Sequence, residues 1–337
     1  MHGSQLKAVW LLLLGAVTST SVVLTGRSTS LDAPPPSPAA PTTLAVQYSG
    51  TLAPRVFRPA VELVLDSSRS MKAPLQGRTR LDQARDVVSR VLDQFPDEMH
   101  VGLRLYGHWG AWRLRRDNPK AGRIPRDDPR LNEDSDLVVP IGPLDDARRG
   151  RMDEWLRWCK PRGKTPLIYS LEQSTADFPH DLRAPRIVVL VSDGQETCGG
   201  ELESLRKKLG QSEHGLMIHV VGFAVDETEA HSQLQDIAEM AGGVYYTAED
   251  ASGLADAIMS AVQQVGFEVF DTLGNRAAGG LLNGPPIDIR PGRYRVRIAG
   301  GGTFLPIDLA MGQTLSLSLD EQGRLTSPDA AADARPY

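Results

Sequence analysis

Short apolar segments alternate with amphipathic segments from Val61 to Val265. The most apolar of them, RIVVLVSDG (186–194), contains five consecutive aliphatic residues, which is typical of a strand that is covered on both faces. Stretches such as LDQARDVVSRVLDQF (81–95) carry apolar residues at helical spacing. This alternation predicts an α/β fold: a doubly wound, mostly parallel sheet of the Rossmann-like kind between two layers of helices.

The individual elements follow from the same periodicity. We expect strands at 61–66, 99–107, 136–142, 186–194, 217–225 and 243–248. We expect helices at 81–95, 146–159, 166–178, 201–210, 231–242 and 251–265.

The pattern changes after residue 265. The segments FEVFDTLGN, PIDIRPGRYRVRIAG and QTLSLSLDEQGRL alternate apolar and polar residues and are broken by glycine and proline. This period of two predicts a small all-β, sandwich-like module at 266–322. The last residues, 323–337, are expected to be a disordered tail.

The N-terminus predicts export. Basic residues in MHGSQLK precede the apolar stretch AVWLLLLGAV, so residues 1–26 are either a cleaved signal peptide or a single retained membrane anchor. Residues 27–55, which are rich in proline, are expected to be a linker to the α/β domain at 56–265. We therefore expect a periplasmic or envelope-bound location. The net charge of −5 gives no support to a nucleic-acid partner.

The loop KPRGKTP (160–166) resembles the end of a nucleotide-binding phosphate loop. Such a loop needs a second glycine five positions before Gly163, and that position is Trp158. The residues before it have the spacing of a helix and not of a buried strand. We therefore reject the nucleotide interpretation, and Thr165 needs another role.

Acidic and hydroxyl side chains follow two predicted strands. Asp66, Ser68 and Ser70 form a D-x-S-x-S motif directly after the first strand, and Asp193 ends the segment RIVVLVSD. Ligands of open α/β sheets bind at the carboxyl ends of strands, so these side chains are expected to converge. An oxygen-only ligand set favours Mg²⁺ or Mn²⁺ over zinc.

These motifs resemble the von Willebrand factor A (VWA) domain and its metal-ion-dependent adhesion site. The resemblance covers about residues 56 to 265 and is strongest to exported bacterial members of the family. It implies that Asp66, Ser68, Ser70, Thr165 and Asp193 surround a metal ion. Thr165 is also expected to cap the helix that follows it, with Pro166 at the first helical position.

The resemblance implies a protein-binding function. The expected protein is an exported adhesion or scaffolding module, not an enzyme, whose Mg²⁺ binds an Asp or Glu carboxylate of a protein partner. Two alternatives stay open: a metal-dependent hydrolase or phosphatase, and a structural envelope protein with a vestigial site. The phosphatase lacks the second acid two residues after Asp66, and the chain contains neither G-x-S-x-G nor H-E-x-x-H.

Three further features bear on the site. Cys159 and Cys198 flank the metal-site loops, and we expect a disulfide between them, with two independent thiols as the alternative. The insertion 108–135 leaves a strand end on the metal-site face, and its tryptophans and arginines are either binding anchors or part of a spacer. His100, His108 and His219 are scattered and show no zinc-site spacing.

Overall fold

The computed structural model describes residues 41–48, 58–117, 124–125, 127–182, 184–211, 215–299, 303–319 and 324–327. The predicted signal peptide or anchor at 1–26 lies outside these residues. Among the described helices, none combines the length and the hydropathy that crossing a membrane requires.

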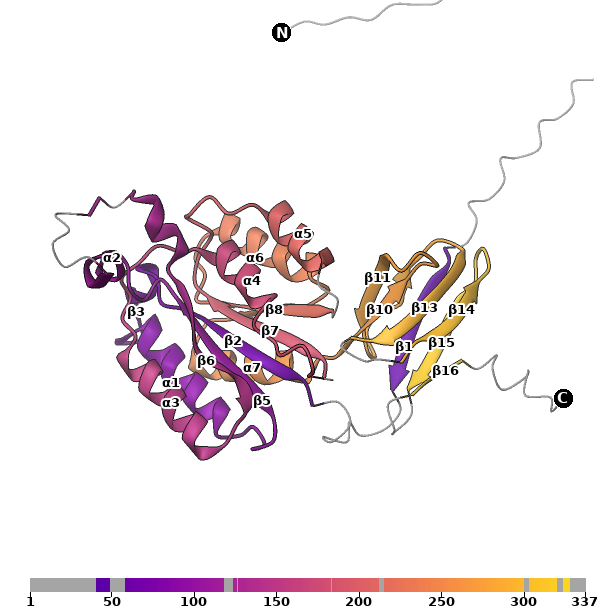
Figure 1. The fold of residues 1–337 in the computed structure, drawn as a ribbon, viewed down its shortest axis with the longest axis horizontal. Helices are drawn as coiled ribbons and strands as arrows, with labels where there is room; N and C mark the ends of the chain where they lie inside the picture. Colours follow the sequence, from indigo (N-terminus) through magenta and orange to yellow (C-terminus); the bar gives the residue numbers. More distant parts are fainter. Residues whose placement is uncertain are drawn as a thin grey trace, which may run out of the picture. The chain divides into compact units, whose positions relative to one another are not determined.

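The centre of the α/β domain is a six-stranded sheet whose strands are parallel except at one edge (Figure 1). In spatial order its strands are β6 (Ser135–Pro143), β5 (His100–Tyr106), β2 (Ala60–Asp66), β7 (Arg186–Ser192), β8 (Leu216–Phe223) and β9 (Tyr245–Ala248). Strand β6 runs antiparallel to β5, whereas all other neighbours are parallel. The predicted fold class is confirmed.

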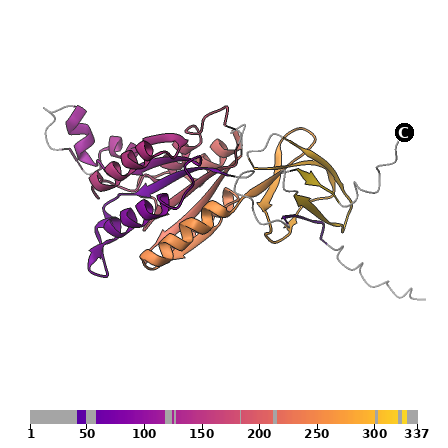
Figure 2. The same cartoon turned by 90° about the horizontal axis from the view of Figure 1, so that it is seen from below.

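Helices cover both faces of this sheet (Figures 1 and 2). One face packs against α1 (Arg80–Leu92), α3 (Asp146–Trp158) and α7 (Ala251–Gln263). The other face packs against α4 (Leu167–Ser174), α5 (Leu202–Gln211) and α6 (Thr228–Met240). Because both faces are covered, every residue of β2 and β7 is buried, which explains their continuous apolar character.

Shorter elements lie between the strands and helices. The first loop contains the 3-10 turn η1 (Ser70–Lys72) and a hairpin of β3 (Pro74–Leu75) and β4 (Arg78–Thr79). The insertion contains α2 (Ala111–Asp117) and the 3-10 turn η2 (Pro129–Glu133).

The β module consists of two four-stranded sheets that share one hydrophobic core. The first sheet contains, in spatial order, β12 (Ile287–Asp288), β1 (Thr43–Tyr48), β15 (Thr314–Leu319) and β16 (Leu325–Thr326). The second contains β11 (Arg276–Leu281), β10 (Gly266–Phe270), β13 (Gly292–Ile298) and β14 (Leu305–Leu309). The predicted alternation holds in β13, where Val296 and Ile298 are buried and Arg293 and Arg295 are exposed.

Two predicted boundaries are wrong. Strand β1 lies inside the predicted linker 27–55, yet it pairs along its whole length with β15 and buries Leu44 and Val46 in the core of the module. Strand β16 lies inside the predicted tail 323–337, and its Leu325 pairs with Leu319. Both segments are short, so their local sequence carries little signal. Pairing with β15 makes them strands.

Candidate metal centre

Asp66 ends β2, the strand between β5 and β7, and its carboxylate is fully buried. Its Oδ1 accepts a hydrogen bond from the backbone N–H of Ser68 (2.7 Å). Its Oδ2 accepts from Tyr106 Oη (2.9 Å) and Ser192 Oγ (2.7 Å), which come from the two neighbouring strands. The position of this carboxylate is therefore set by all three central strands.

Ser68, Ser70 and Asp193 continue from Asp66 as one hydrogen-bonded cluster. The hydroxyl oxygens of Ser68 and Ser70 are 2.9 Å apart. Ser70 Oγ in turn donates to Asp193 Oδ1 at 2.6 Å. Four of the five predicted ligands thus lie together, although 123 residues separate Ser70 from Asp193.

The loop that carries Thr165 lies beside the first loop. Gly163 forms a β-bridge with Ser68, and its carbonyl accepts from the backbone N–H of Arg69 (3.1 Å). On its other side, the backbone N–H of Thr165 donates to Thr197 Oγ1 (2.9 Å) in the loop after Asp193. Thr165 is buried between the other two loops.

The predicted helix cap at Thr165 is wrong. Helix α4 begins at Leu167, and Pro166 occupies the cap position without a side-chain hydrogen bond. Glu196, which follows Asp193, instead accepts from the backbone N–H of Ile168 (2.8 Å). A distant carboxylate thus satisfies a helix N–H that local capping would otherwise serve.

Gly107 allows the loop after Asp66 to contact the loop that carries Thr165. Its φ is +69°, and a Cβ at this position would lie 2.6 Å from Lys164 O and 2.7 Å from Ser68 Cα. Both of these neighbours are backbone atoms, which cannot move aside as a flexible side chain can. Only glycine therefore permits this close crossing.

The electrostatics of the cluster favour a cation. Burial and the charge of Asp193 raise the pKa of Asp66 to about 7. Burial also raises the pKa of Asp193, whereas Ser70 and Arg80 oppose the rise. Arg80 Nη1 lies 3.0 Å from Asp193 Oδ2 and supplies part of the missing positive charge. Two buried carboxylates with serine hydroxyls between them fit a divalent cation with hard oxygen ligands. That they bind one stays a prediction.

The predicted disulfide between Cys159 and Cys198 is wrong, because both cysteines are free. Cys159 is buried in the core on the α1 and α3 side of the sheet, and its Sγ donates to Leu156 O. Cys198 lines a different surface hollow together with Ile168, which belongs to the core on the other side. Cys159 thus packs in the core, whereas Cys198 lies in a partly exposed loop.

The start of the insertion lies against the loops of the cluster, as predicted. Gly110 packs against the backbone of Arg162, the residue directly before Gly163, which forms the bridge with Ser68. The tryptophans of the insertion form an aromatic cluster with those of α3: the ring centroids of Trp109 and Trp158 are 4.8 Å apart. Trp112 is 53% exposed and Trp158 is 41% exposed. A binding role for this surface stays a prediction.

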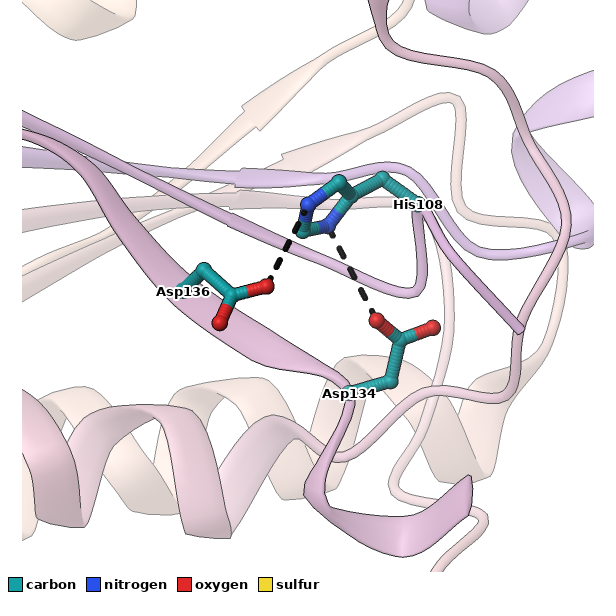
Figure 3. Close-up of side chains that lie close together, drawn as sticks. All are labelled: His108, Asp134 and Asp136. Carbon is teal, nitrogen blue, oxygen red and sulfur yellow. Dashed lines mark ion pairs between the residues drawn. The ribbon is translucent and has the colours of Figure 1, made fainter. Parts of the chain in front are cut away.

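A second polar cluster, which sequence reasoning missed, lies at the base of the insertion (Figure 3). The ring of His108, which follows β5, lies between Asp134 and Asp136 at the start of β6. Burial and the charges of Arg113 and Arg162 lower the pKa of His108 to about 3. Burial raises the pKa of Asp134 to about 6.

The antiparallel direction of β6 explains why this cluster was missed. The carboxyl end of β5 meets the amino end of β6, so His108 reaches the motif Asp134-Ser-Asp136. The sequence signal is an Asp-x-Asp at the start of a strand that follows a histidine at the end of another. It becomes readable only if β6 is known to run antiparallel.

Two curated proteins are similar to this chain in sequence. The uncharacterized protein YwmD of Bacillus subtilis is 26% identical over 193 residues, which cover 57% of this chain and 79% of YwmD. The uncharacterized protein YwmC of the same organism is 25% identical over 190 residues, which cover 56% of this chain and 76% of YwmC. No family model matches the sequence.

A solved structure gives the fold a name. The von Willebrand factor type A protein from Catenulispora acidiphila superimposes with a TM-score of 0.52 over 88% of this chain and 76% of its own length, at 12% identity. Identity this low bears on the fold alone. With the sheet order and the convergent loops, it identifies the α/β domain of this chain as having the von Willebrand factor A fold.

Proposed function

We propose that this chain is an exported, metal-dependent protein-binding module. In this proposal Asp66, Ser68, Ser70, Thr165 and Asp193 hold Mg²⁺ or Mn²⁺, directly or through water. The metal would supply a positively charged position that an Asp or Glu carboxylate of a protein partner completes. The observation that carries the proposal is the hydrogen-bonded cluster from Asp66 to Asp193 at the carboxyl ends of adjacent strands.

The surface beside the cluster supports an acidic partner. A cavity of about 490 Å³ opens between the insertion and the loops of the cluster. Its cationic lining residues are Arg69, Arg115, Arg162 and Lys164. Within the described residues, Arg162 Nη1 is buried and has no hydrogen-bond partner. A cationic lining of this kind attracts anionic groups, so we expect acidic residues of the partner near the metal-binding carboxylate.

The exposed tryptophans are the expected apolar anchors of the same interface. Trp112 and Trp158 are exposed, and Arg162, which lines the cavity, lies over the ring of Trp112 at 5.5 Å. Tryptophan and arginine are the residue types most often found at interface hot spots. Shortening the insertion is therefore expected to weaken partner binding and to leave the Mg²⁺ or Mn²⁺ affinity of the cluster around Asp66 nearly unchanged.

The burial of Asp66 argues against an aspartyl-phosphate enzyme. Its carboxylate is fully buried, and both of its oxygens accept hydrogen bonds from neighbouring groups. A nucleophile must instead reach the phosphorus atom of a substrate. We therefore propose binding and not catalysis, in the cell envelope or periplasm that the N-terminal segment predicts.

The test begins with the metal. Titration of Mn²⁺ into the full chain should give one site, and Ser70→Ala should weaken it at least about tenfold because a ligand is lost. The matched control is Ser89→Ala, which removes a hydroxyl that bonds Asp153, away from the cluster. Parent protein that binds neither Mn²⁺ nor Mg²⁺ would contradict the proposal.

The second stage tests the partner. The full chain is used to recover binding proteins from the envelope of its own cell, in Mg²⁺ and in EDTA, with Ser70→Ala in parallel. A partner recovered only by metal-loaded parent protein supports the mechanism. Recovery that is equal under all conditions removes the metal from it. Mg²⁺-dependent phosphatase activity that Asp66→Asn abolishes would favour the enzyme instead.

A further inference from the structure

Among the described residues, the buried ring of His108 makes no hydrogen bond. Its side chain is fully buried, and in the described part of the chain neither ring nitrogen finds a hydrogen-bond partner. A neutral imidazole carries one N–H group and one lone pair, and leaving each unpaired in the interior is unfavourable. A ligand bound to one of these nitrogens would remove this unfavourable arrangement.

Two carboxylates face this ring (Figure 3). Nδ1 of His108 lies 3.9 Å from Asp134 Oδ1, and Nε2 lies 3.5 Å from Asp136 Oδ2. One ligand atom from each residue can be chosen so that all three lie within 4.8 Å of one another. A metal ion with bonds of about 2.0 to 2.2 Å would bring such atoms to roughly 3 to 3.5 Å apart, so the atoms must approach one another by at most about 1 to 2 Å to complete the site.

The carboxylates are already oriented by outer partners. Asp134 Oδ2 accepts from the backbone N–H of Gly110 at 2.6 Å, which leaves Oδ1 turned toward the ring. Asp136 Oδ2 accepts from the indole N–H of Trp109 at 2.9 Å. Hydrogen bonds of this kind hold ligating carboxylates in place at metal sites.

The site has an entrance and a competitor. The Asp136 side chain is 34% exposed, so an ion can reach the cluster from that side. Arg113 Nη1 lies 3.1 Å from Asp136 Oδ1. The Arg113 side chain is 29% exposed, so it can turn toward water when a metal binds. The metal must therefore compete with the guanidinium of Arg113 for Asp136.

We propose that His108, Asp134 and Asp136 bind a divalent transition-metal ion, with zinc as the best match. One imidazole nitrogen and two carboxylate oxygens suit zinc, and water would complete the coordination shell. Imidazole is a poor ligand for Mg²⁺, which prefers oxygen, so this site differs in metal from the cluster around Asp66. The proposal stands whether or not that cluster binds Mg²⁺.

The position of the site gives it a structural role. A Cβ on Gly163 would lie 2.6 Å from Asp134 Oδ2, and the backbone N–H of Gly107 donates to Asp134 O at 2.8 Å. Asp134 is thus packed against the Thr165 loop at Gly163 and against Gly107, where that loop crosses the loop after Asp66. Zinc bound there would connect the base of the insertion to β6 and would hold the neighbouring Thr165 loop in position.

The experiment is a calorimetric zinc titration of the metal-stripped full chain in excess Mg²⁺. We expect one zinc per chain for the parent protein, for Ser70→Ala and for the histidine control His100→Gln. His108→Gln and Asp136→Asn should each bind zinc at least about 100-fold more weakly, since even outer partners of a metal site contribute 10- to 100-fold. Cobalt, which reports its ligands in visible absorption, should lose its bands in the same two variants.

Asp136→Asn keeps the test decisive if His108→Gln does not fold, because the Asp136 side chain is partly exposed. A parent protein that binds no zinc overturns the proposal. Zinc affinity and cobalt bands that survive both substitutions overturn it as well. Zinc binding that Ser70→Ala removes would assign the ion to the other cluster and would also refute the site at His108.

Discussion

Replacing Arg104 by methionine should be among the most damaging single changes in the α/β domain. The Arg104 side chain is 5% exposed and that of Glu62 is fully buried. Arg104 Nε donates to Glu62 Oε1 at 2.9 Å and Nη1 donates to Ser135 Oγ at 3.1 Å, while Nη2 pairs with Asp177. The guanidinium therefore holds β2, β5, β6 and the segment after α4 together.

The expected loss follows from the charge that is left behind. Removing one partner of a buried ion pair costs about 3 to 5 kcal/mol, a large share of the 5 to 15 kcal/mol typical of a whole domain. Asp177 is 14% exposed and can turn toward water, but Glu62 cannot. Adding Glu62→Leu to Arg104→Met should restore most of the lost stability, because it removes the unpaired charge.

The loss should depend on pH. Burial and the charge of Asp177 raise the pKa of Glu62 well above its ordinary value of 4.5, even with Arg104 present. A raised folded-state pKa favours the folded state below pH 4.5, and this advantage is lost as the pH rises. Without Arg104 the pKa of Glu62 should rise further, so the stability difference between variant and parent should be smaller near pH 4.5 than near pH 8.

Urea unfolding followed by tryptophan fluorescence measures this effect, since Trp109, Trp112, Trp155 and Trp158 all lie in the α/β domain. The control is Arg78→Met, which breaks an ion pair with Asp86 in which both side chains are 52% exposed. It should lower the free energy of unfolding far less than Arg104→Met does, because the pair is exposed to solvent. A loss below 1 kcal/mol for Arg104→Met, or a loss independent of pH, would refute the reasoning.

Three further predictions concern Gly107, His219 and the two cysteines. Gly107→Ala should destabilise the protein by about 1 to 3 kcal/mol more than Gly77→Ala and should weaken Mn²⁺ binding. Both glycines have a positive φ, but of the two only Gly107 has backbone atoms where the Cβ would lie. Equal losses in urea unfolding would contradict this. Burial lowers the pKa of His219 from 6.5 to about 4, so the stability it contributes is present above pH 6.5, and about 3 kcal/mol is lost as the pH falls toward 4. An NMR titration that finds His219 charged at pH 6 would rule this out. Because Cys159 and Cys198 are free, reductant should leave the Tm unchanged and both thiols should react with a thiol reagent after unfolding, whereas a reductant-sensitive Tm would point to a bond between them.

Local pattern predicted most of the α/β domain. Strand β7 is recognisable because a run of aliphatic residues has few alternatives to a doubly covered strand. Asp66 and Asp193 could be placed together for a similar reason, since parallel strands end at the same edge of the sheet. Strand β1 was missed because its partner β15 lies 271 residues away and its six residues look like part of the linker.

The sequence by itself determined the order of strands and helices, the change to a β module, and the residue types that gather at the strand ends. All of these depend on periodicity within a few residues. Only the tertiary structure decided the crossing at Gly107, the free state of Cys159 and Cys198, and the meeting of His108 with Asp134 and Asp136. These features depend on strand direction and on contacts between distant segments, and burial raises the pKa values of Asp66 and Asp134 and lowers that of His108.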